Sequence, residues 1–299
     1  MRLSLQVRRQ GIDSFTRDDF RFVSSKLATD PSRLILVGGQ AIEVWGVLLD
    51  VPNPVGEANP LTEDVDWLGG KVDAKWLCDL LGPKESVELQ LAPDFDPTLS
   101  SALAYLERPD GRILLMDFMR SIVGPTSERI HDLAVTVELH GGAVIRVMHP
   151  LLCLESRLAN LHIIPAKRNG NGPMQAQWAI NIAEAYLKTI HGPKAADQLP
   201  KACREIAAIA LSDHGRYCYV SHDLNPLSAV STEVLALATE DFVRLEWPHV
   251  VARVAKRQAR WKEIAARDLP QVRSQPLESQ GAVPEGIAAP VRIRPRPAR

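Results

Sequence analysis

Two short stretches of this 299-residue chain carry acidic side chains where they suit metal and phosphate chemistry. Asp64 and Asp66 flank one apolar residue, and in a strand such side chains project from the same face. Asp117 lies inside the apolar run 113–119, where an unpaired ionised carboxylate would cost several kcal/mol. A divalent cation shared with phosphate oxygens is bound by carboxylates. We therefore expect Asp64, Asp66 and Asp117 to act together.

A glycine pair precedes these acids and favours a phosphate-binding turn. Gly38 and Gly39 close the apolar run 34–37, and a helix is expected from residue 41. Glycines between a buried strand and a helix let backbone N–H groups approach a phosphate closely. We expect Gly38, Gly39 and the adjacent Gln40 to contact a nucleotide.

Each acidic position also has a simpler interpretation. Acid-x-acid triplets occur by chance several times in a chain of this composition, and Asp94 and Asp96 form one for which we expect no role. Asp117 is also compatible with a structural ion pair to a buried base. The glycine turn upstream and the apolar residue between Asp64 and Asp66 favour the functional interpretation.

The elements that must position these residues alternate between helix and strand up to residue 149. The apolar spacing predicts helices at 18–28, 41–49 and 72–81, strands at 33–37, 64–68, 87–91, 103–107 and 112–119, and a hairpin of 135–139 with 144–148. After Pro150 the pattern predicts helices alone, at 151–162, 174–191, 201–211, 231–245 and 250–267. We expect an α+β (α/β) fold with a mixed sheet in 1–149, a helical domain in 150–270 and a disordered Pro/Arg-rich tail in 271–299.

Composition is that of an ordinary globular protein, with 45% hydrophobic and 24% charged residues. The formal net charge of −1 means that any nucleic-acid binding must come from local patches. The four cysteines form no CxxC pair. The basic N-terminus lacks an apolar signal-peptide core, and no apolar run approaches about 18 residues. We expect a cytoplasmic protein without membrane contact.

With these residues together, the chain resembles the polymerase-β-like nucleotidyltransferase superfamily, and within it the AbiEii-type toxin nucleotidyltransferases. The family pattern is a strand ending in Gly-Gly, a helix, then Ser/Thr-x-Asp-hydrophobic-Asp and a later acid on a strand. Gly38-Gly39, the motif Thr62-Glu63-Asp64-Val65-Asp66 and Asp117 match it. The segment from Pro150 to Arg157 is similar to a family helix whose basic residue contacts the nucleotide phosphates.

This resemblance implies a nucleotidyltransferase-type sheet and a Mg²⁺-dependent transfer from a nucleoside triphosphate to an acceptor hydroxyl. It implies that Thr62 and Arg157 join the nucleotide-binding residues. It also implies an acceptor on RNA, such as the 3′ end of tRNA, or on a protein, and a toxin paired with a cognate antitoxin. Arg157 stands where the family usually has lysine, and residues 177–184 lack an aspartate that relatives tend to have.

Two alternative functions use the same residues. A non-catalytic nucleotide- or RNA-binding module of the same fold is favoured by the missing aspartate in 177–184. A metal-dependent nuclease would use the same carboxylates and would cut RNA without an added nucleotide.

Other charged clusters are further candidates for binding sites. Arg253, Lys256, Arg257 and Arg260 form one stripe on the expected last helix, which suits an RNA backbone and an ordinary solvated face equally well. Lys167 and Arg168 border a Gly-Asn loop from which they would reach phosphates. His214, Cys218 and His222 have helical spacing, but the β-favouring residues 217–220 argue against a helix and against a zinc site there.

Overall fold

Seven strands within the described residues form one mixed sheet, in the order β3-β4-β5-β2-β1-β7-β6. The computed structural model describes residues 3–54, 56, 64–83, 86–139, 141–192 and 195–268. The strands are β1 Ile35–Val37, β2 Val65–Leu68, β3 Val87–Leu91, β4 Ser100–Glu107, β5 Ile113–Met119, β6 Val135–Glu138 and β7 Val144–Val147. Strand β2 runs antiparallel to β1 and parallel to β5, so it joins the two halves of the sheet.

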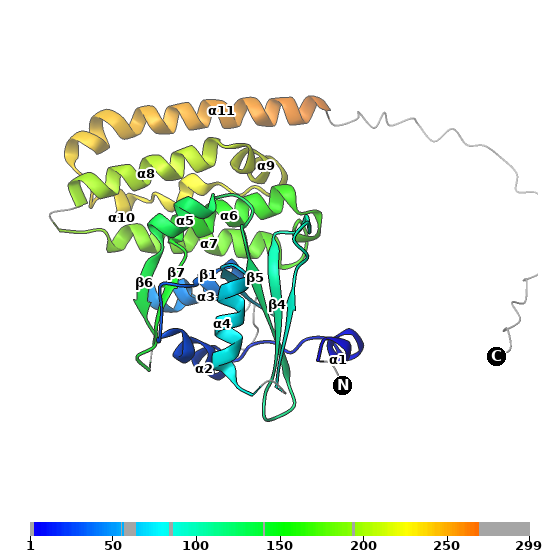
Figure 1. Cartoon of the computed structure of the whole chain (residues 1–299). Coiled ribbons are helices and arrows are strands. Elements are labelled where there is room, and N and C mark those ends of the chain that lie inside the picture. Colours follow the sequence, from blue (N-terminus) through cyan, green and yellow to red (C-terminus); the bar gives the residue numbers. More distant parts are fainter. Residues whose placement is uncertain are drawn as a thin grey trace, which may run out of the picture.

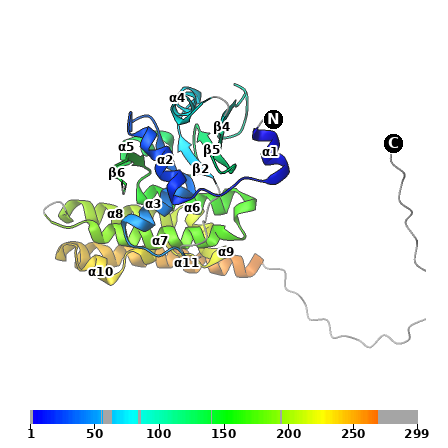
Figure 2. The ribbon, with the colours of Figure 1, turned by 90° about the horizontal axis from the view of Figure 1, so that it is seen from below.

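The N-terminal helices cover the two faces of this sheet. They are α1 Leu3–Gln10, α2 Arg17–Leu27, α3 Gly38–Leu48, α4 Lys71–Leu81 and α5 Ser127–Leu133. Helix α4 packs on β3, β4 and α2, and α1 packs on β3 and β4 from the other side (Figure 2). Successive side chains of a strand point to opposite faces of the sheet. In β5, Leu114, Met116 and Phe118 are fully buried on one face, whereas Leu115 and Met119 are half-buried on the other.

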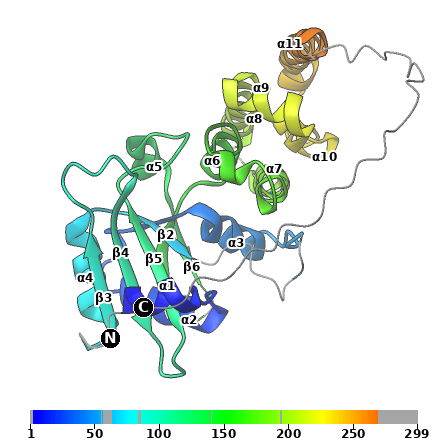
Figure 3. The same ribbon diagram turned by 90° about the vertical axis from the view of Figure 1, so that its right-hand side faces the viewer.

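The C-terminal half is a stack of helices on the end of the sheet where α3 lies (Figures 1 and 3). Helices α6 and α7 pack on each other and on α3, α9 packs on α6 and α8, and α11 packs on α8 and α9. In Figure 1, α11 is the outermost layer. The elements are α6 Pro150–Ile163, η1 Pro165–Lys167, α7 Asn171–Thr189, α8 Ala195–Leu211, α9 Asp213–His222, η2 Pro226–Ala229, α10 Thr232–Leu235, the π-helix η3 Phe242–Glu246 and α11 Trp247–Asp268.

Local sequence signals begin several of these helices. A capping box of Thr16 and Asp19 begins α2, and Pro150 occupies the first turn of α6. His149 caps α6, because its Nδ1 accepts the N–H of Leu151 at 3.2 Å, while its Nε2 lies 2.9 Å from the Tyr186 hydroxyl. Burial lowers the pKa of His149 to about 4, so the ring is neutral near pH 7.

The fold confirms the mixed α+β class with a helical C-terminal region. The sheet ends with β7 and α6 begins at Pro150, as expected, yet one hydrophobic cluster includes residues of both halves. The division into domains 1–149 and 150–270 therefore stays a prediction. The tail 271–299 and Thr62 lie outside the described residues, as does most of the proline-rich loop before Asp64.

Some expected elements were wrong. Residues 213–222 form a helix, because Ser212 caps it and Gly215 lies so close to α8 that a Cβ there would be 2.3 Å from the Ile209 carbonyl oxygen. The expected helix 231–245 is broken into α10 and η3, and the helices α1 and α5 were not expected. Strand β4 begins at Ser100 instead of residue 103, which brings Ser100 next to Asp117.

Candidate active site

Asp66 and Asp117 are direct neighbours across two parallel strands. They are register partners in the β2–β5 pair, and neighbouring strands lie about 4.8 Å apart. Register partners point to the same face of a sheet, so both carboxylates leave β2 and β5 on one side. Both side chains are half-buried. The sequence placed these acids on separate strands, and the structure brings them together.

Gly38 makes room for the carboxylate of Asp66. Val37, the last residue of β1, is the register partner of Asp66, and Gly38 follows with φ +69°. A Cβ on Gly38 would lie 1.8 Å from Oδ2 of Asp66. Only glycine combines the left-handed backbone with this close approach. Gly38, the first residue of the glycine pair, is thus tied to Asp66 by direct packing.

Asp64 completes the acidic group from the segment just before β2. It is half-buried, and its negative charge raises the pKa of both Asp66 and Asp117. That effect requires Asp64 to lie near both carboxylates. Thr62, which the family resemblance adds to this motif, lies outside the described residues.

The pKa of Asp66 is raised well above its ordinary value. Burial is the main cause and the charge of Asp64 the second, while the positive charges of Arg157 and Lys167 oppose them. Clustered carboxylates whose pKa is raised by burial and by neighbouring negative charges are a frequent sign of a site that binds a cation. A bound cation would favour the ionised carboxylates and reverse this shift.

Ser100 positions the carboxylate of Asp117. The Ser100 hydroxyl donates a hydrogen bond to Oδ1 of Asp117 from the first residue of β4. Burial raises the pKa of Asp117, this hydrogen bond lowers it, and the charge of Asp64 raises it further, with a net upward shift. Sequence reasoning missed Ser100, because it began the strand three residues later.

Arg157 brings a buried positive charge from α6 to this acidic group. Its side chain is only 8% exposed, and its Nη1 donates to Oε1 of Gln175 on α7 at 3.2 Å. Its Nε has no hydrogen-bond partner among the described residues. Burial lowers the pKa of Arg157, and the charges of Asp66, Cys153 and Asp64 raise it. A buried guanidinium with an unused N–H beside carboxylates is well suited to a phosphate.

The first turn of α3 and the loop after α6 add further phosphate-binding groups. Gly38, Gly39 and Gln40 lie in the first turn of α3, where no side chain caps the helix within the described sequence. The first N–H groups of a helix lack intrahelical partners and attract anions. Lys167 is exposed at the end of η1, and its charge reaches Asp66. The distant segments 38–40, 64–66, 117, 157 and 167 therefore form one site.

A magnesium ion fits this donor set when substrate phosphates complete it. Within the described ranges, no three histidine, cysteine, aspartate or glutamate side chains form a ready-made metal cage. Mg²⁺ is usually held by one or two carboxylates together with phosphate oxygens and waters. Asp66 and Asp117 supply adjacent carboxylates. Because Gly38 has no Cβ, the Asp66 carboxylate occupies the space beside it.

The other candidate clusters form no metal site within the described residues. His214 and His222 are on α9, and the Sγ of Cys218 is buried and donates to the Leu158 carbonyl, so the zinc site stays unsupported in the described part of the chain. Asp94, of the second acid-x-acid triplet, is exposed and pairs with Lys71 at 2.5 Å. The stripe Arg253, Lys256, Arg257 and Arg260 is exposed on α11.

The chain was compared with known proteins. No family model matches it, and no curated protein matches it. Among solved structures it is similar to the crystal structure of the Megavirus polyadenylate synthase, with a TM-score of 0.32 and 9% identity. The match covers 62% of this chain and 39% of that chain, so this chain spans about two fifths of its length. So weak a likeness carries no argument about activity. No helix in the described part of the chain has the length and apolar character to cross a lipid bilayer.

Proposed function

We propose that this protein is a nucleotidyltransferase, which moves a nucleotide from a nucleoside triphosphate to an acceptor hydroxyl. The observation that carries this proposal is the pairing of Asp66 with Asp117 on adjacent parallel strands, beside Gly38 and a buried Arg157. Carboxylates facing a buried guanidinium can hold a cation and a phosphate side by side.

Positively charged side chains and backbone N–H groups bind the negatively charged triphosphate. The unused Nε–H of Arg157 and the first-turn N–H groups of Gly39 and Gln40 donate to phosphate oxygens, and the exposed Lys167 adds a positive charge from η1. Gln175 keeps the guanidinium of Arg157 oriented. Thr62 belongs to the same proposed nucleotide site by the family resemblance.

In the transfer step, the oxygen of the acceptor hydroxyl attacks the α-phosphorus. A new O–P bond forms, the bond from the α-phosphorus to the oxygen bridging to the β-phosphate breaks, and pyrophosphate leaves. Asp117 accepts the proton of the attacking hydroxyl. The hydrogen bond from the Ser100 hydroxyl fixes the orientation of the Asp117 carboxylate for this proton transfer.

Asp66 and Asp117 would hold Mg²⁺ together with phosphate oxygens, and by the family resemblance Asp64 joins them. When bound, such ions neutralise the charge that develops on the phosphoryl oxygens and align the attacking and leaving oxygens. The acceptor on RNA or protein, the toxin role with a cognate antitoxin, and a cytoplasmic location belong to the proposal through the family resemblance alone.

The test is incubation with each α-labelled nucleoside triphosphate, Mg²⁺ and total RNA or protein. We expect label in RNA or protein with the wild type, and at least about 100-fold less with Asp66→Asn. Asp94→Asn is the matched control, because Asp94 belongs to an acid-x-acid triplet on the surface. Arg157→Met should weaken triphosphate binding in a titration. No label with any nucleotide would refute the transferase.

A non-catalytic nucleotide-binding module is the second candidate. It is favoured by α7, where the buried Gln175 holds Arg157 and no aspartate occurs in residues 177–184. In the same experiment, such a module would show nucleotide-dependent thermal stabilisation without label or pyrophosphate release. RNA cleavage without added nucleotide would instead indicate a nuclease.

A further inference from the structure

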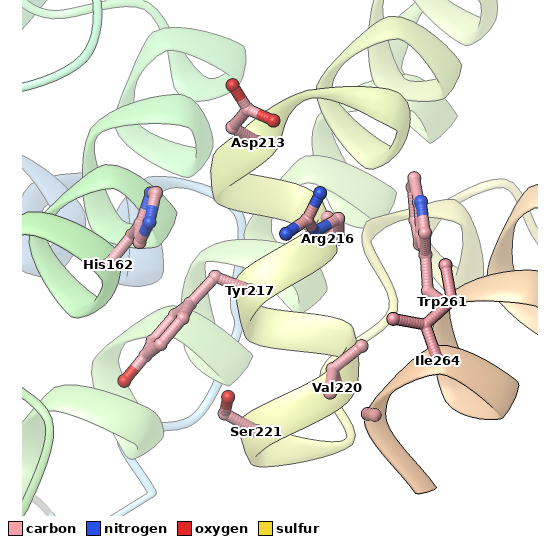
Figure 4. A pocket seen from close by; sticks show the side chains of 9 residues that line it. His162, Asp213, Arg216, Tyr217, Val220, Ser221, Trp261 and Ile264 are labelled. Carbon is pink, nitrogen blue, oxygen red and sulfur yellow. The ribbon is translucent and has the colours of Figure 1, made fainter. Parts of the chain in front are cut away.

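Two adjoining cavities on the helical region lie outside the carboxylate site. The first, between α6, α9 and α11, has a volume of about 470 Å³, and the second, between α8, α9 and α11, about 580 Å³. Both are lined by Asp213, Arg216 and Trp261, so the two cavities adjoin at these residues, and together they are called the groove. Figure 4 shows the first of the two. Each volume is in the usual range of about 300–1,000 Å³ for ligand sites.

The groove is strongly basic. Arg216 lies along both parts, and Arg204, Arg253 and Arg257 line the second. Arg204 is paired with Glu246, whereas Arg216, Arg253 and Arg257 are exposed and form no ion pair within the described residues. Asp213 is an acidic lining residue that offsets part of this charge. Three unpaired guanidinium groups in one groove attract a ligand that carries several negative charges.

Aromatic faces alternate with these arginines. Trp261 is half-exposed between the two cavities, and Tyr217 lines the first. Tyr217 stacks on His162 with ring centroids 4.9 Å apart and an interplanar angle of 24°. Figure 4 shows Arg216 between Tyr217 and Trp261. A ligand with both phosphates and flat rings would use the exposed arginines and the half-exposed ring of Trp261.

Helix α6 connects the groove with the carboxylate site, because it carries both His162 and Arg157. The guanidinium of Arg168 lies 5.3 Å over the Tyr217 ring, and its neighbour Lys167 acts electrostatically on Asp66. His162 follows Arg157 by five residues on α6, which is about 7.5 Å along the helix axis.

We propose that this groove binds a single-stranded polynucleotide whose end reaches the carboxylate site. The arginines contact successive phosphates and Trp261 stacks on a base, which is how proteins bind single strands without reading their sequence. The role of this polynucleotide as the acceptor rests on the proposed nucleotidyl transfer. The binding of the polynucleotide to the groove is independent of that proposal.

The test measures binding of fluorescein-labelled RNA and DNA single strands, about 12 nucleotides long, by fluorescence anisotropy. The variant Arg253→Gln/Arg257→Gln should bind at least about tenfold more weakly than the wild type at about 0.1 M salt. Its plot of log affinity against log salt should be less steep by about 1.4, since each phosphate contact contributes about 0.7 for a single strand. Trp261→Leu should weaken binding while leaving the salt slope unchanged.

The matched control is Lys256→Gln/Arg260→Gln. It removes the same charge from the same helix, but neither residue lines the groove. We expect it to bind almost as tightly as the wild type. Equal weakening by both double variants would overturn the groove and leave only a general charge effect. Tighter binding of a blunt duplex than of either single strand would overturn it as well.

The binding and transfer experiments distinguish a failure of the groove proposal from a failure of the transferase proposal. The Arg253→Gln/Arg257→Gln variant should keep its triphosphate affinity, because these arginines lie far from Asp66 along the stack of helices. Groove-dependent binding of single strands without nucleotidyl transfer would refute the proposed function alone. Transfer without groove-dependent binding would refute this inference alone. RNA bound more tightly than DNA would identify RNA as the strand.

Discussion

Among single residues, Gly38 shows why a glycine must precede the carboxylates. A side chain there would occupy the place of the Asp66 carboxylate, since the added Cβ would be 1.8 Å from Oδ2. The backbone at Gly38 is also left-handed, with φ +69°. These are separate requirements, and they can be tested separately.

Gly38→Ala should lose stability and activity together. We expect about 1–2 kcal/mol less unfolding free energy from the left-handed backbone, and a loss of transfer of about 100-fold because Asp66 is displaced. Gly111→Ala is the control, since Gly111 has φ +84° and nothing within 4 Å of its added Cβ. It should lose similar stability in chemical denaturation and retain transfer. Full activity in Gly38→Ala would refute the packing argument.

Ser100→Ala should change the pH dependence of transfer. The hydrogen bond from Ser100 favours the ionised form of Asp117, so its loss raises the Asp117 pKa further. The acidic limb of the kcat/KM profile should therefore move to higher pH, while Ser100→Thr should restore the wild-type profile. A lower kcat/KM with an unmoved limb would mean that Ser100 has only a structural role.

Among secondary-structure elements, the packing of α3 on α7 keeps the two halves of the site together. Helix α3 presents the glycine turn, and α7 carries Gln175, which holds Arg157. At their contact Gly46 faces Trp178, and a Cβ on Gly46 would lie 2.4 Å from Cζ2 of that ring. The indole Nε1 also donates to the Val51 carbonyl at 3.3 Å.

Gly46→Ala should overpack this contact and lower the unfolding free energy by about 1–3 kcal/mol. Combining it with Trp178→Leu removes the obstructing ring, so the double variant should be less destabilised than the sum of the two single variants. Thermal or urea unfolding of all three variants measures this coupling. Strict additivity would show that the two side chains do not limit each other.

The sequence predicted the sheet better than the helical region, and the reason is physical. Asp66 and Asp117 lie in short apolar runs that favour strands, and the two-residue period of a strand places Asp64 and Asp66 on one face. Residues 217–220 favour a strand by local propensity, but the Ser212 cap and the packing of Gly215 on α8 override it. Ser100 and Gln175 were not predicted, because their roles depend on strand and helix neighbours that no local pattern reveals.

At the scale of the whole molecule, a buried ionic cluster connects α2 with the β4–β5 hairpin. Asp19 is 1% exposed and accepts hydrogen bonds from Arg108 Nε at 2.9 Å and Arg112 Nη1 at 2.7 Å, as well as from Thr16. Burial raises the pKa of Asp19, but the bonds from Arg112 and Thr16 outweigh it and lower the pKa from 3.8 to about 2. The ionised form is therefore favoured by folding.

This cluster should make global stability depend on pH in acid. Because the folded pKa is lowered, Asp19 contributes its full stabilisation above pH 3.8, and loses it as the pH falls toward 2. The contribution is about 2 kcal/mol. Asp19→Asn should remove that part of the acid dependence in urea unfolding, whereas the exposed Asp18→Asn should not. Equal acid dependence in wild type and Asp19→Asn would contradict this assignment.

The site lies between the sheet and the helical stack. The central claim is that its residues together perform nucleotidyl transfer. The most direct measurement compares α-labelled with γ-labelled nucleoside triphosphate in the presence of Mg²⁺ and acceptor, for wild type and Asp117→Asn. We predict that the wild type transfers the α-label, releases the γ-label as pyrophosphate, and that Asp117→Asn does neither. Transfer of the γ-label, or equal α-labelling by Asp117→Asn, would contradict the account.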